Sequence, residues 1–177
     1  LISHLQNSGV LRTDQIIEAF YAIDRRNFIT EEQEQFCYED RPLQIGEGQT
    51  ISQPTTVSFM LELLQPQKGE KILDVGSGSG WTTALLAHIV GPKGSVHGVE
   101  LIPRLAEFGN KNLAKYEFPQ ASIVKARDVL GLPDKGPFDK ILVSAGNTEV
   151  PDELTKQLKD SGTMLIPVQN AVWKVTK

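Results

Sequence analysis

The sequence predicts an α/β fold in which helices cover both faces of a doubly wound, mostly parallel sheet, preceded by a helical N-terminal lead-in. From Ser52 onward, strand-like segments alternate with helical segments of about ten residues, a pattern typical of parallel βαβ units. The strands are also continuously apolar, as in Ile141-Leu142-Val143, which a sheet covered on both faces requires. Such sheets bind ligands outside the carboxyl ends of their strands, so functional residues are expected there.

Length and composition narrow the class of protein. The 177 residues fit a single domain, residues 1–177, because domains commonly span about 100–200 residues. The formal net charge is −4 and no run of lysine and arginine occurs, so no nucleic-acid partner is expected. No apolar stretch approaches the ~20 residues of a membrane span, and the N-terminus lacks a signal-peptide pattern. Together with a single cysteine, Cys37, these features favour the reducing cytoplasm, without a membrane partner. A monomer is expected.

Residues 1–53 form the lead-in, which is expected to be mostly helical and polar. Thr13 suits the N-cap of a helix, because Ile16 and Phe20 follow it at helical spacing. The segment from Tyr38 to Pro54 contains several Gly and Pro breaks and no sustained period, so an irregular conformation is expected. A long irregular stretch within a compact domain is usually functional or disordered, and the mix of apolar and polar residues argues against disorder.

Residues 54–177 form the alternating core. The expected helices are one that starts at Pro54 and carries Val57, Met60, Leu61 and Leu64, then Trp81–Val90, Pro103–Tyr116 and Pro151–Lys159. The expected strands are Lys71–Val75, Ser95–Glu100, Ala121–Lys125, Lys140–Ser144, Thr163–Val168 and Ala171–Val175.

The strongest chemical signal is the turn between the first of these strands and its helix. Glycines at 76, 78 and 80 allow the backbone to turn sharply and to approach a ligand closely. The helix that begins near Trp81 points its partially positive N-terminus at the same place. Glu100 closes the next strand, where its carboxylate can accept hydrogen bonds from both hydroxyls of a ribose. The pattern predicts a Rossmann-like nucleoside site.

Two alternatives apply to this turn. A dinucleotide fingerprint would place a small residue at position 81, where Trp81 is too bulky for tight packing of helix against strand. The Gly-x-Gly-x-Gly pattern instead suits a nucleoside ligand without a pyrophosphate, of which S-adenosylmethionine is the common one. The other alternative is a plain cluster of turn glycines, which the flanking strand, the helix and Glu100 disfavour. No group of His, Cys and Asp has metal-ligand spacing, so no metal site is expected.

Two motifs carry a resemblance to a known family. The segment Gly46-Glu47-Gly48-Gln49-Thr50-Ile51-Ser52-Gln53-Pro54, followed by Leu73-Asp74-Val75-Gly76-Ser77-Gly78-Ser79-Gly80, resembles the protein-L-isoaspartate O-methyltransferases. Further matches run in collinear order through Gly136-Pro137-Phe138-Asp139 to Leu165-Ile166-Pro167-Val168. The first motif is specific to that family, whereas most class I methyltransferases share the glycine loop.

The resemblance implies repair of damaged protein. The family transfers a methyl group from S-adenosylmethionine to the free α-carboxylate of L-isoaspartyl residues, which leaves S-adenosylhomocysteine. The partners would be isoaspartyl-containing proteins and peptides. Two other functions remain open, namely a class I methyltransferase with another substrate and an inactive, cofactor-binding homologue that acts as an interaction module.

The resemblance also implies roles for the first motif. Ser52 would lie beside the transferable methyl group and orient the substrate carboxylate, as the catalytic and substrate-binding residue. The alternative is that Ser52 only caps the helix that starts at Pro54. Thr50, Ile51 and Gln53 would form a lid over the cofactor, with Gln53 also contacting the substrate.

The remaining cofactor contacts would come from the carboxyl ends of the strands. Asp74 would hold the ammonium group of the methionine moiety, although a solvated loop acid is the alternative for it. The other implied contacts are Gly76, Ser77, Gly78 and Gly80 in the glycine loop, Glu100 at the ribose, and Leu101 and Val129 near the adenine.

Two departures from the family pattern affect this assignment. The segment Ala126-Arg127-Asp128-Val129 stands where the family has Gly-Asp-Gly, so either Arg127 or Asp128 occupies the position of the adenine-binding acid. Asp128 is preferred, because the adenine amino group needs an acceptor. The sequence given also stops at Lys177, where the family continues with another strand, so a core that ends early is expected.

Overall fold

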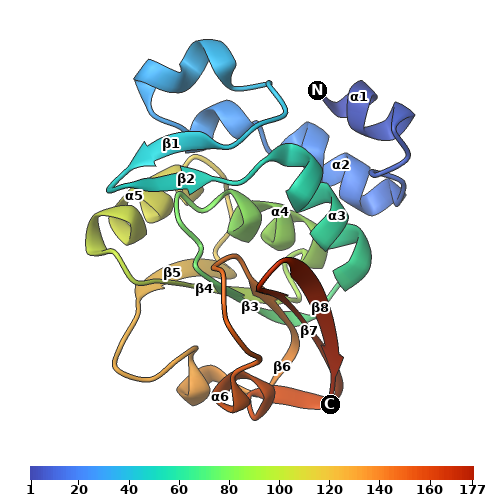
Figure 1. The fold of residues 1–177 in the computed structure, drawn as a ribbon, viewed down its shortest axis with the longest axis vertical. Helices are drawn as coiled ribbons and strands as arrows, with labels where there is room; N and C mark the ends of the chain where they lie inside the picture. Colours follow the sequence, from blue (N-terminus) through green and yellow to red (C-terminus); the bar gives the residue numbers. More distant parts are fainter.

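A six-stranded sheet lies at the centre of the molecule (Figure 1). In spatial order its strands are β5 (Ala121–Lys125), β4 (Ser95–Glu100), β3 (Lys71–Val75), β6 (Phe138–Val143), β7 (Leu158–Val168) and β8 (Ala171–Thr176). The computed structural model describes all of residues 1–177. Only β8 runs antiparallel to its neighbour. The strand order reverses at β3, between β4 and β6, which is where doubly wound sheets bind ligands.

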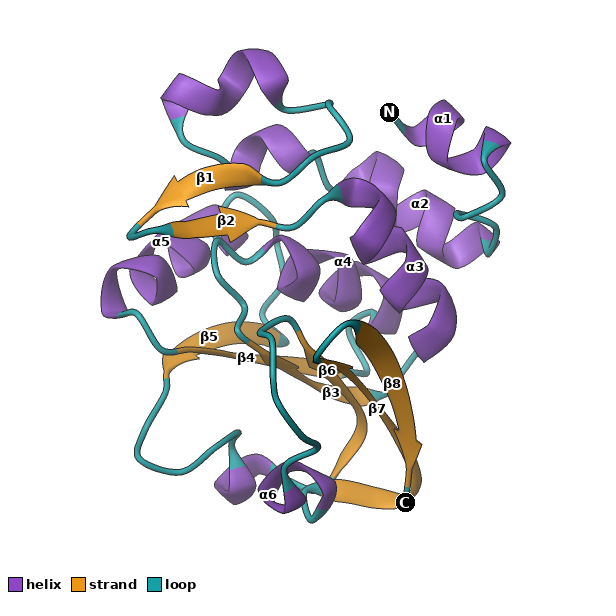
Figure 2. Ribbon diagram, in the orientation of Figure 1, coloured by secondary structure: helices purple, strands orange, loops and turns teal.

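Helices lie on both faces of the sheet, but they are distributed unequally (Figures 1 and 2). The upper face in these views carries α3 (Pro54–Leu64), α4 (Trp81–Val90) and α5 (Pro103–Leu113), with α1 (Ile2–Asn7) and α2 (Asp14–Ala22) packed outside them. The lower face carries only α6 (Asp152–Thr155) and a short 3-10 turn, Pro133–Lys135. None of these helices is long and apolar enough to cross a bilayer.

Two hydrophobic clusters pack against the two faces of the sheet. Neighbouring strand residues alternate between the clusters, because successive side chains of a strand point to opposite faces. In β3, for example, Ile72 belongs to the larger cluster under the helices and Leu73 to the smaller one beneath the sheet. The larger cluster also contains Leu5 and Phe28 of the lead-in, so the lead-in and the sheet share one core.

The expected boundaries of several core elements are confirmed. Strands β3, β4 and β5 and helix α4 begin and end at the expected residues. The expected helix over Pro151–Lys159 is wrong, because α6 spans only Asp152–Thr155 and β7 already begins at Leu158. The first residues of β7 form a bulge: Leu158 pairs with Phe138, but the next pairing is Thr163 with Lys140. Ser161 adopts a positive φ of 64° within this bulge.

The expectation of an irregular segment from Tyr38 to Pro54 is also wrong. The segment contains an antiparallel hairpin of β1 (Leu43–Gly46) and β2 (Gln49–Ile51). Its two turn residues, Glu47 and Gly48, have φ values of 54° and 70°, as a tight hairpin with the twist of its strands requires. Figure 2 shows this hairpin above the carboxyl edge of the central sheet.

The hairpin leads directly into α3, and one carboxylate fixes this junction. Asp40, which precedes the hairpin, accepts hydrogen bonds from the amide nitrogen of Thr55 at 2.8 Å and from its hydroxyl at 2.6 Å. The free amide groups in the first turn of a helix need such acceptors. The side chain of Asp40, in the segment that precedes the hairpin, therefore caps the helix that follows it.

Candidate active site

A cleft of about 500 Å³ opens at the carboxyl ends of β3, β4 and β6, beneath the hairpin. The hairpin and the residue that follows it form the roof, and the ends of the three strands together with the segment after β5 form the floor and the far wall. The lining residues are Ile45, Gln49, Thr50, Ser52, Val75, Gly76, Gly78, Val99, Glu100, Leu101, Ile102, Leu105, Ala126, Arg127, Asp128, Val129, Leu130, Gly131, Ser144 and Ala145.

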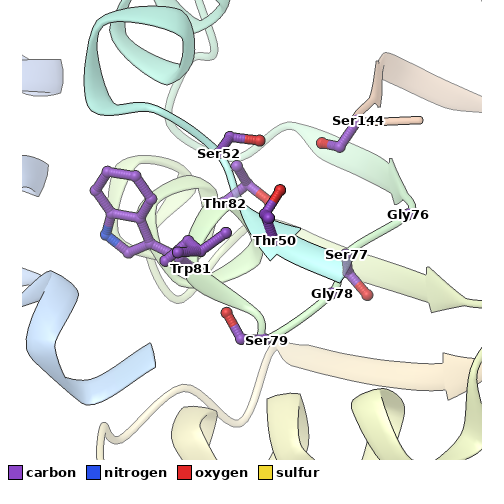
Figure 3. Close-up of a pocket in the computed structure, with 10 residues that line it drawn as sticks. Thr50, Ser52, Gly76, Ser77, Gly78, Ser79, Trp81, Thr82 and Ser144 are labelled. Atoms are coloured by element: carbon purple, nitrogen blue, oxygen red, sulfur yellow. The ribbon is translucent and has the colours of Figure 1, made fainter. Parts of the chain in front are cut away.

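A second, much smaller pocket of about 30 Å³ adjoins this cleft, and we call it the hydroxyl pocket. It shares five wall residues with the cleft, namely Thr50, Ser52, Gly76, Gly78 and Ser144. Its other walls are Ile51, Ser77, Ser79, Trp81 and Thr82, so hydroxyl side chains predominate and no charged side chain lines it. Figure 3 shows the Ser52 and Ser144 hydroxyls pointing toward each other from opposite sides of the pocket.

The glycine loop forms the floor between the two cavities. Gly76 and Gly78 line both cavities, with φ values of 79° and 52° that favour glycine. Gly80 lines neither cavity. A Cβ atom at Gly80 would lie 3.1 Å from the carbonyl oxygen of Gly109 and 3.0 Å from Ile123, so this glycine permits close packing of α4 against α5. The structure thus separates the packing role of Gly80 from the cavity-facing positions of Gly76 and Gly78.

Glu100 occupies the carboxyl end of β4 and lies in the wall of the cleft. Its side chain is buried, and its two oxygens accept hydrogen bonds from the amides of Gly78 at 2.8 Å and Ile102 at 2.9 Å. Each carboxylate oxygen has a second lone pair, so Glu100 can still accept from a ligand hydroxyl. Leu101 follows it with 74% of its surface exposed, which is unusual for a leucine beside a cleft and favours contact with a flat apolar ligand group.

Asp74 lies under the floor, fully buried, and lines neither cavity. One of its oxygens, Oδ2, accepts hydrogen bonds from the hydroxyls of Thr82 at 2.7 Å and Thr83 at 2.6 Å, whereas Oδ1 has no partner. Burial raises the pKa of Asp74 to about 6, although the two threonine hydroxyls act in the opposite direction. The alternative of a solvated loop acid is therefore wrong. The carboxylate retains one buried acceptor that no protein donor satisfies.

Arg127, Asp128 and Val129 all reach the wall of the cleft. The guanidinium of Arg127 is paired with Asp134 at 3.0 Å on the surface, so this side chain turns away to another partner. Asp128 makes no such pair. Val129 is half-exposed at the same wall. This arrangement favours Asp128 over Arg127 as the acceptor for a base.

Ser52 lies between β2 and α3 and lines both cavities. The alternative in which it only caps α3 is wrong, because the N-cap is Gln53 and no side-chain cap bond forms there. Gln53 lines neither cavity, and its side-chain amide donates to the carbonyl oxygen of Asp40 at 3.0 Å. The structure therefore brings Thr50, Ile51 and Ser52 to the site but holds Gln53 at the base of the hairpin.

Sequence reasoning missed two residues of the site. The sequence places Ser144 only at the end of a strand. That strand, β6, pairs with β3, and residues that follow these neighbouring strands lie where doubly wound sheets bind ligands. Arg25 lies 27 residues before Ser52 in the sequence, yet its Nη2 donates to the carbonyl oxygen of Ser52 at 3.2 Å. No local pattern in the sequence connects Arg25 with Ser52.

Comparison with known proteins gives a consistent family. The family model described as protein-L-isoaspartate(D-aspartate) O-methyltransferase matches residues 1–177. The protein-L-isoaspartate O-methyltransferase of Methanopyrus kandleri is 42% identical over 182 residues, covering 100% of this chain and 80% of the relative. That of Aeropyrum pernix is 43% identical over 169 residues, covering 95% of this chain but only 65% of the relative.

Solved structures agree with the sequence comparison. One protein-L-isoaspartate O-methyltransferase superposes with a TM-score of 0.88 at 29% identity, covering 99% of this chain and 58% of its own. A β-aspartate methyltransferase from Plasmodium falciparum, in complex with S-adenosyl-L-homocysteine, also has a TM-score of 0.88, at 26% identity with 99% and 88% coverage. The chain thus spans about two thirds or less of some relatives and most of others. It belongs to the protein-L-isoaspartate (D-aspartate) O-methyltransferase family.

Proposed function

We propose that this chain catalyses methyl transfer from S-adenosylmethionine to the free α-carboxylate of L-isoaspartyl residues in damaged proteins. The observation that carries the proposal is the hydroxyl pocket beside the nucleoside-sized cleft, with Ser52 in the wall of both. Family membership supports the reaction, and the pocket supports the role of Ser52 in it. The methyl ester formed in this way cyclises to a succinimide, which reopens in part to normal aspartate.

The cleft suits S-adenosylmethionine in size and in chemistry. Its volume of about 500 Å³ lies within the range of small-molecule sites, roughly 300–1,000 Å³. Glu100 would accept from the ribose hydroxyls, while Leu101 and Val129 would flank the adenine and Asp128 would accept from its amino group. The unpartnered Oδ1 of Asp74 supports a role for that carboxylate toward the ammonium group. Thr50 and Ile51 would cover the cofactor, and Gly76, Ser77 and Gly78 would lie beneath it.

The protein has to supply orientation rather than acid–base chemistry. When bound, S-adenosylmethionine supplies a methyl group on a positively charged sulfur, which keeps the electron pair of the broken C–S bond. A carboxylate is ionised at neutral pH, so one of its oxygens forms the new C–O bond without any proton transfer. Aligning the reacting atoms can contribute up to about 7–11 kcal/mol.

The hydroxyl pocket is suited to this task. Hydroxyl donors such as Ser52 and Ser144 can fix the orientation of a carboxylate by hydrogen bonds. No lysine or arginine side chain lines the pocket, so no ion pair would withdraw charge from the attacking oxygen. The pocket therefore favours a carboxylate that is held but remains nucleophilic.

Isoaspartyl-containing proteins and peptides would be the partners. We further propose that the chain acts as a monomer in the cytoplasm, without nucleic-acid or membrane partners. The net charge of −4 and the absence of a lysine- and arginine-rich run support the proposal on nucleic acid.

One assay tests the function directly. The protein is incubated with methyl-labelled S-adenosylmethionine and an isoaspartyl peptide, with the matching aspartyl peptide as the control. We expect base-labile label on the isoaspartyl peptide alone. Calorimetric binding of S-adenosylhomocysteine without turnover would instead indicate an inactive, cofactor-binding homologue.

The Ser52→Ala variant tests the catalytic residue. One hydrogen bond to a charged group contributes about 1.5–3 kcal/mol, so we expect kcat/KM for the peptide to fall about 10- to 100-fold. The Kd of S-adenosylhomocysteine should change by less than about threefold, because the Ser52 hydroxyl would bind the substrate carboxylate and not the cofactor. Ser58→Ala is the matched control, since the buried Ser58 hydroxyl in α3 has no hydrogen-bond partner and lines neither cavity. Full turnover by Ser52→Ala would exclude the role.

A further inference from the structure

The guanidinium of Arg25 is buried directly behind the hydroxyl pocket. Arg25 has 2% of its surface exposed and forms no ion pair with a carboxylate. Burial lowers its pKa to about 10, so it remains charged at neutral pH. Taking a charge out of water carries a desolvation penalty, so stability alone is a weak reason for a buried cation. Such a residue therefore calls for a functional explanation.

Main-chain carbonyl groups surround the Arg25 charge. Nη1 donates to the carbonyl oxygens of Cys37 at 2.9 Å and Glu39 at 3.3 Å, and Nη2 donates to those of Arg41 at 2.9 Å and Ser52 at 3.2 Å. Three of these acceptors precede the β1–β2 hairpin and the fourth follows it. One planar group thus joins both legs of the hairpin at its base, a geometry that the fixed fork of arginine provides.

The second leg of the hairpin is the one that carries Ser52. A further tie runs between the legs, where Gln53 donates to the carbonyl oxygen of Asp40 and Asp40 caps α3 through Thr55. The hydrogen bond from Arg25 to Ser52 is the one that acts on the backbone of the proposed catalytic residue itself. The position of the Ser52 hydroxyl in the pocket therefore depends on the Arg25 fork.

Arg25 also contacts a second wall of the same pocket. Its guanidinium carbon lies 5.3 Å from the ring centroid of Trp81, within the range of a cation–π contact. Trp81 is 2% exposed, packs edge-on against Phe20, and lines the hydroxyl pocket. Arg25 thus contacts both the Ser52 segment and the Trp81 indole, and both of these residues line the hydroxyl pocket.

We propose that Arg25 is a positioning residue for the acceptor site, which holds the Ser52 backbone and the Trp81 ring in the geometry that receives the substrate carboxylate. This inference rests on the proposed function of the same site. It assigns Arg25 to the substrate side of the reaction, because none of its hydrogen-bond acceptors lies on the strand ends that would bind the cofactor.

The Arg25→Lys variant tests the proposal, with Arg26→Lys as the matched control. Lysine keeps the charge but cannot bridge the Arg41 and Ser52 carbonyl groups with a planar fork. The neighbouring Arg26 is exposed and pairs with Glu34 at 3.7 Å. We expect kcat/KM for the isoaspartyl peptide to fall at least about tenfold in Arg25→Lys, while the Kd of S-adenosylhomocysteine changes by less than about threefold. Arg26→Lys should match the wild type in both.

Peptide binding without turnover provides a second readout. In a Trp173→Phe background, Trp81 is the only tryptophan and reports on the pocket. With S-adenosylhomocysteine present, titration of the isoaspartyl peptide should change the Trp81 emission, with a Kd at least about fivefold weaker in Arg25→Lys. A kcat/KM within about threefold of the wild type, or a parallel loss of cofactor affinity, would overturn the proposal.

The Asp40→Ala variant decides the question if Arg25→Lys fails to fold. Asp40 is only partly buried, and its loss removes the second tie at the hairpin base without emptying the core. We expect about a three- to tenfold loss of peptide kcat/KM at unchanged cofactor Kd. Wild-type kinetics in this variant would then overturn the proposal. Absence of methylation by the wild type would instead refute the proposed function, so the two failures are distinguishable.

Discussion

Among single residues, Asp74 is a buried carboxylate whose pKa depends strongly on the fold. Its carboxylate is fully buried, and two threonine hydroxyls satisfy Oδ2 while Oδ1 has no partner. Desolvation of this kind disfavours the charged form, and the pKa of Asp74 accordingly rises from 3.8 to about 6. At neutral pH the free protein therefore holds an ionised carboxylate that a cationic ligand group would stabilise.

The raised pKa of Asp74 predicts a specific pH dependence of stability. Between the unfolded pKa of 3.8 and the folded pKa of about 6, the folded state binds more protons, so stability decreases as the pH rises through this window. An Asp74→Asn variant has no such charge. We expect its free energy of unfolding to increase relative to that of the wild type by on the order of 2 kcal/mol between pH 4 and pH 7.5, so that the variant becomes relatively more stable.

Urea unfolding of both proteins at the two pH values, without cofactor, measures this difference. The difference between the proteins is the informative quantity, because it cancels the pH dependence of the other groups. A difference that stays constant with pH would contradict the assignment of a raised pKa to Asp74. The same variant should bind S-adenosylmethionine more weakly at pH 7.5 if the carboxylate faces the ammonium group.

Secondary-structure elements differed in how well the sequence predicted them, for physical reasons. Strands β3 and β4 and helix α4 are mostly buried, and Gly or Pro residues lie close to their ends, so local patterns define them. Strand β5 is mostly exposed, with Ile123 as its one buried residue. The β1–β2 hairpin escaped prediction because its strands have only four and three residues and its turn is Glu47-Gly48 rather than Asn-Gly. Leu154 and Leu158 have helical spacing, which wrongly predicts a helix over the start of β7.

The same distinction holds for the site. Glu100 and the glycine loop were predictable because strand, turn and helix follow one another in the sequence. Ser144 reaches the pocket only through tertiary structure, beside β3, and Arg25 contacts the pocket wall at Ser52 only across the base of the hairpin. Residues of this second kind become visible only when the fold is known.

Between elements, Glu62 provides the main polar link from α3 to α2. Burial raises the pKa of this carboxylate, but hydrogen bonds from the amides of Thr13 and Arg12 and from the Thr13 hydroxyl outweigh that effect and leave the pKa below its usual range. The Glu62 side chain thus ties α3 to the two residues that precede α2, where the Thr13 hydroxyl makes no cap bond to the helix. We expect Glu62→Ala to destabilise the fold by about 2–4 kcal/mol, because it leaves these donors without an acceptor.

Chemical denaturation of Glu62→Ala measures this loss, and Glu62→Gln is the informative companion. Glutamine keeps one oxygen acceptor, so it should lose about half as much stability. Because the folded pKa of Glu62 is lowered, the contribution of the wild-type carboxylate is present above its unfolded pKa and is lost as the pH falls through the folded value. Equal stabilities of wild type and Glu62→Ala at neutral pH would contradict a stabilising role for these hydrogen bonds.

Across the whole molecule, the lead-in and the sheet are parts of one packed body. The larger hydrophobic cluster contains Leu5, Phe20 and Phe28 from the lead-in together with Leu61 and Trp81 from α3 and α4. The two parts also meet through polar contacts, for example where the Tyr116 hydroxyl accepts from the backbone amide of Asp24 at 3.0 Å. Apolar burial is the main stabilising term in folding, so a shared cluster makes separate unfolding of either part costly.

We therefore expect residues 1–177 to unfold as a single cooperative unit. Trp81 lies where the lead-in meets α4, so its emission in a Trp173→Phe background reports on their interface, while far-ultraviolet circular dichroism reports on the sheet and helices. The two transitions should coincide in urea. Phe28→Ala is the decisive variant, because Phe28 is fully buried and stacks on Tyr116 at a centroid distance of 5.9 Å. Its loss should cost about 3–5 kcal/mol and move both transitions together. If the Trp81 transition alone moved to lower urea, the lead-in would be an independent folding unit and the single-domain organisation would be wrong.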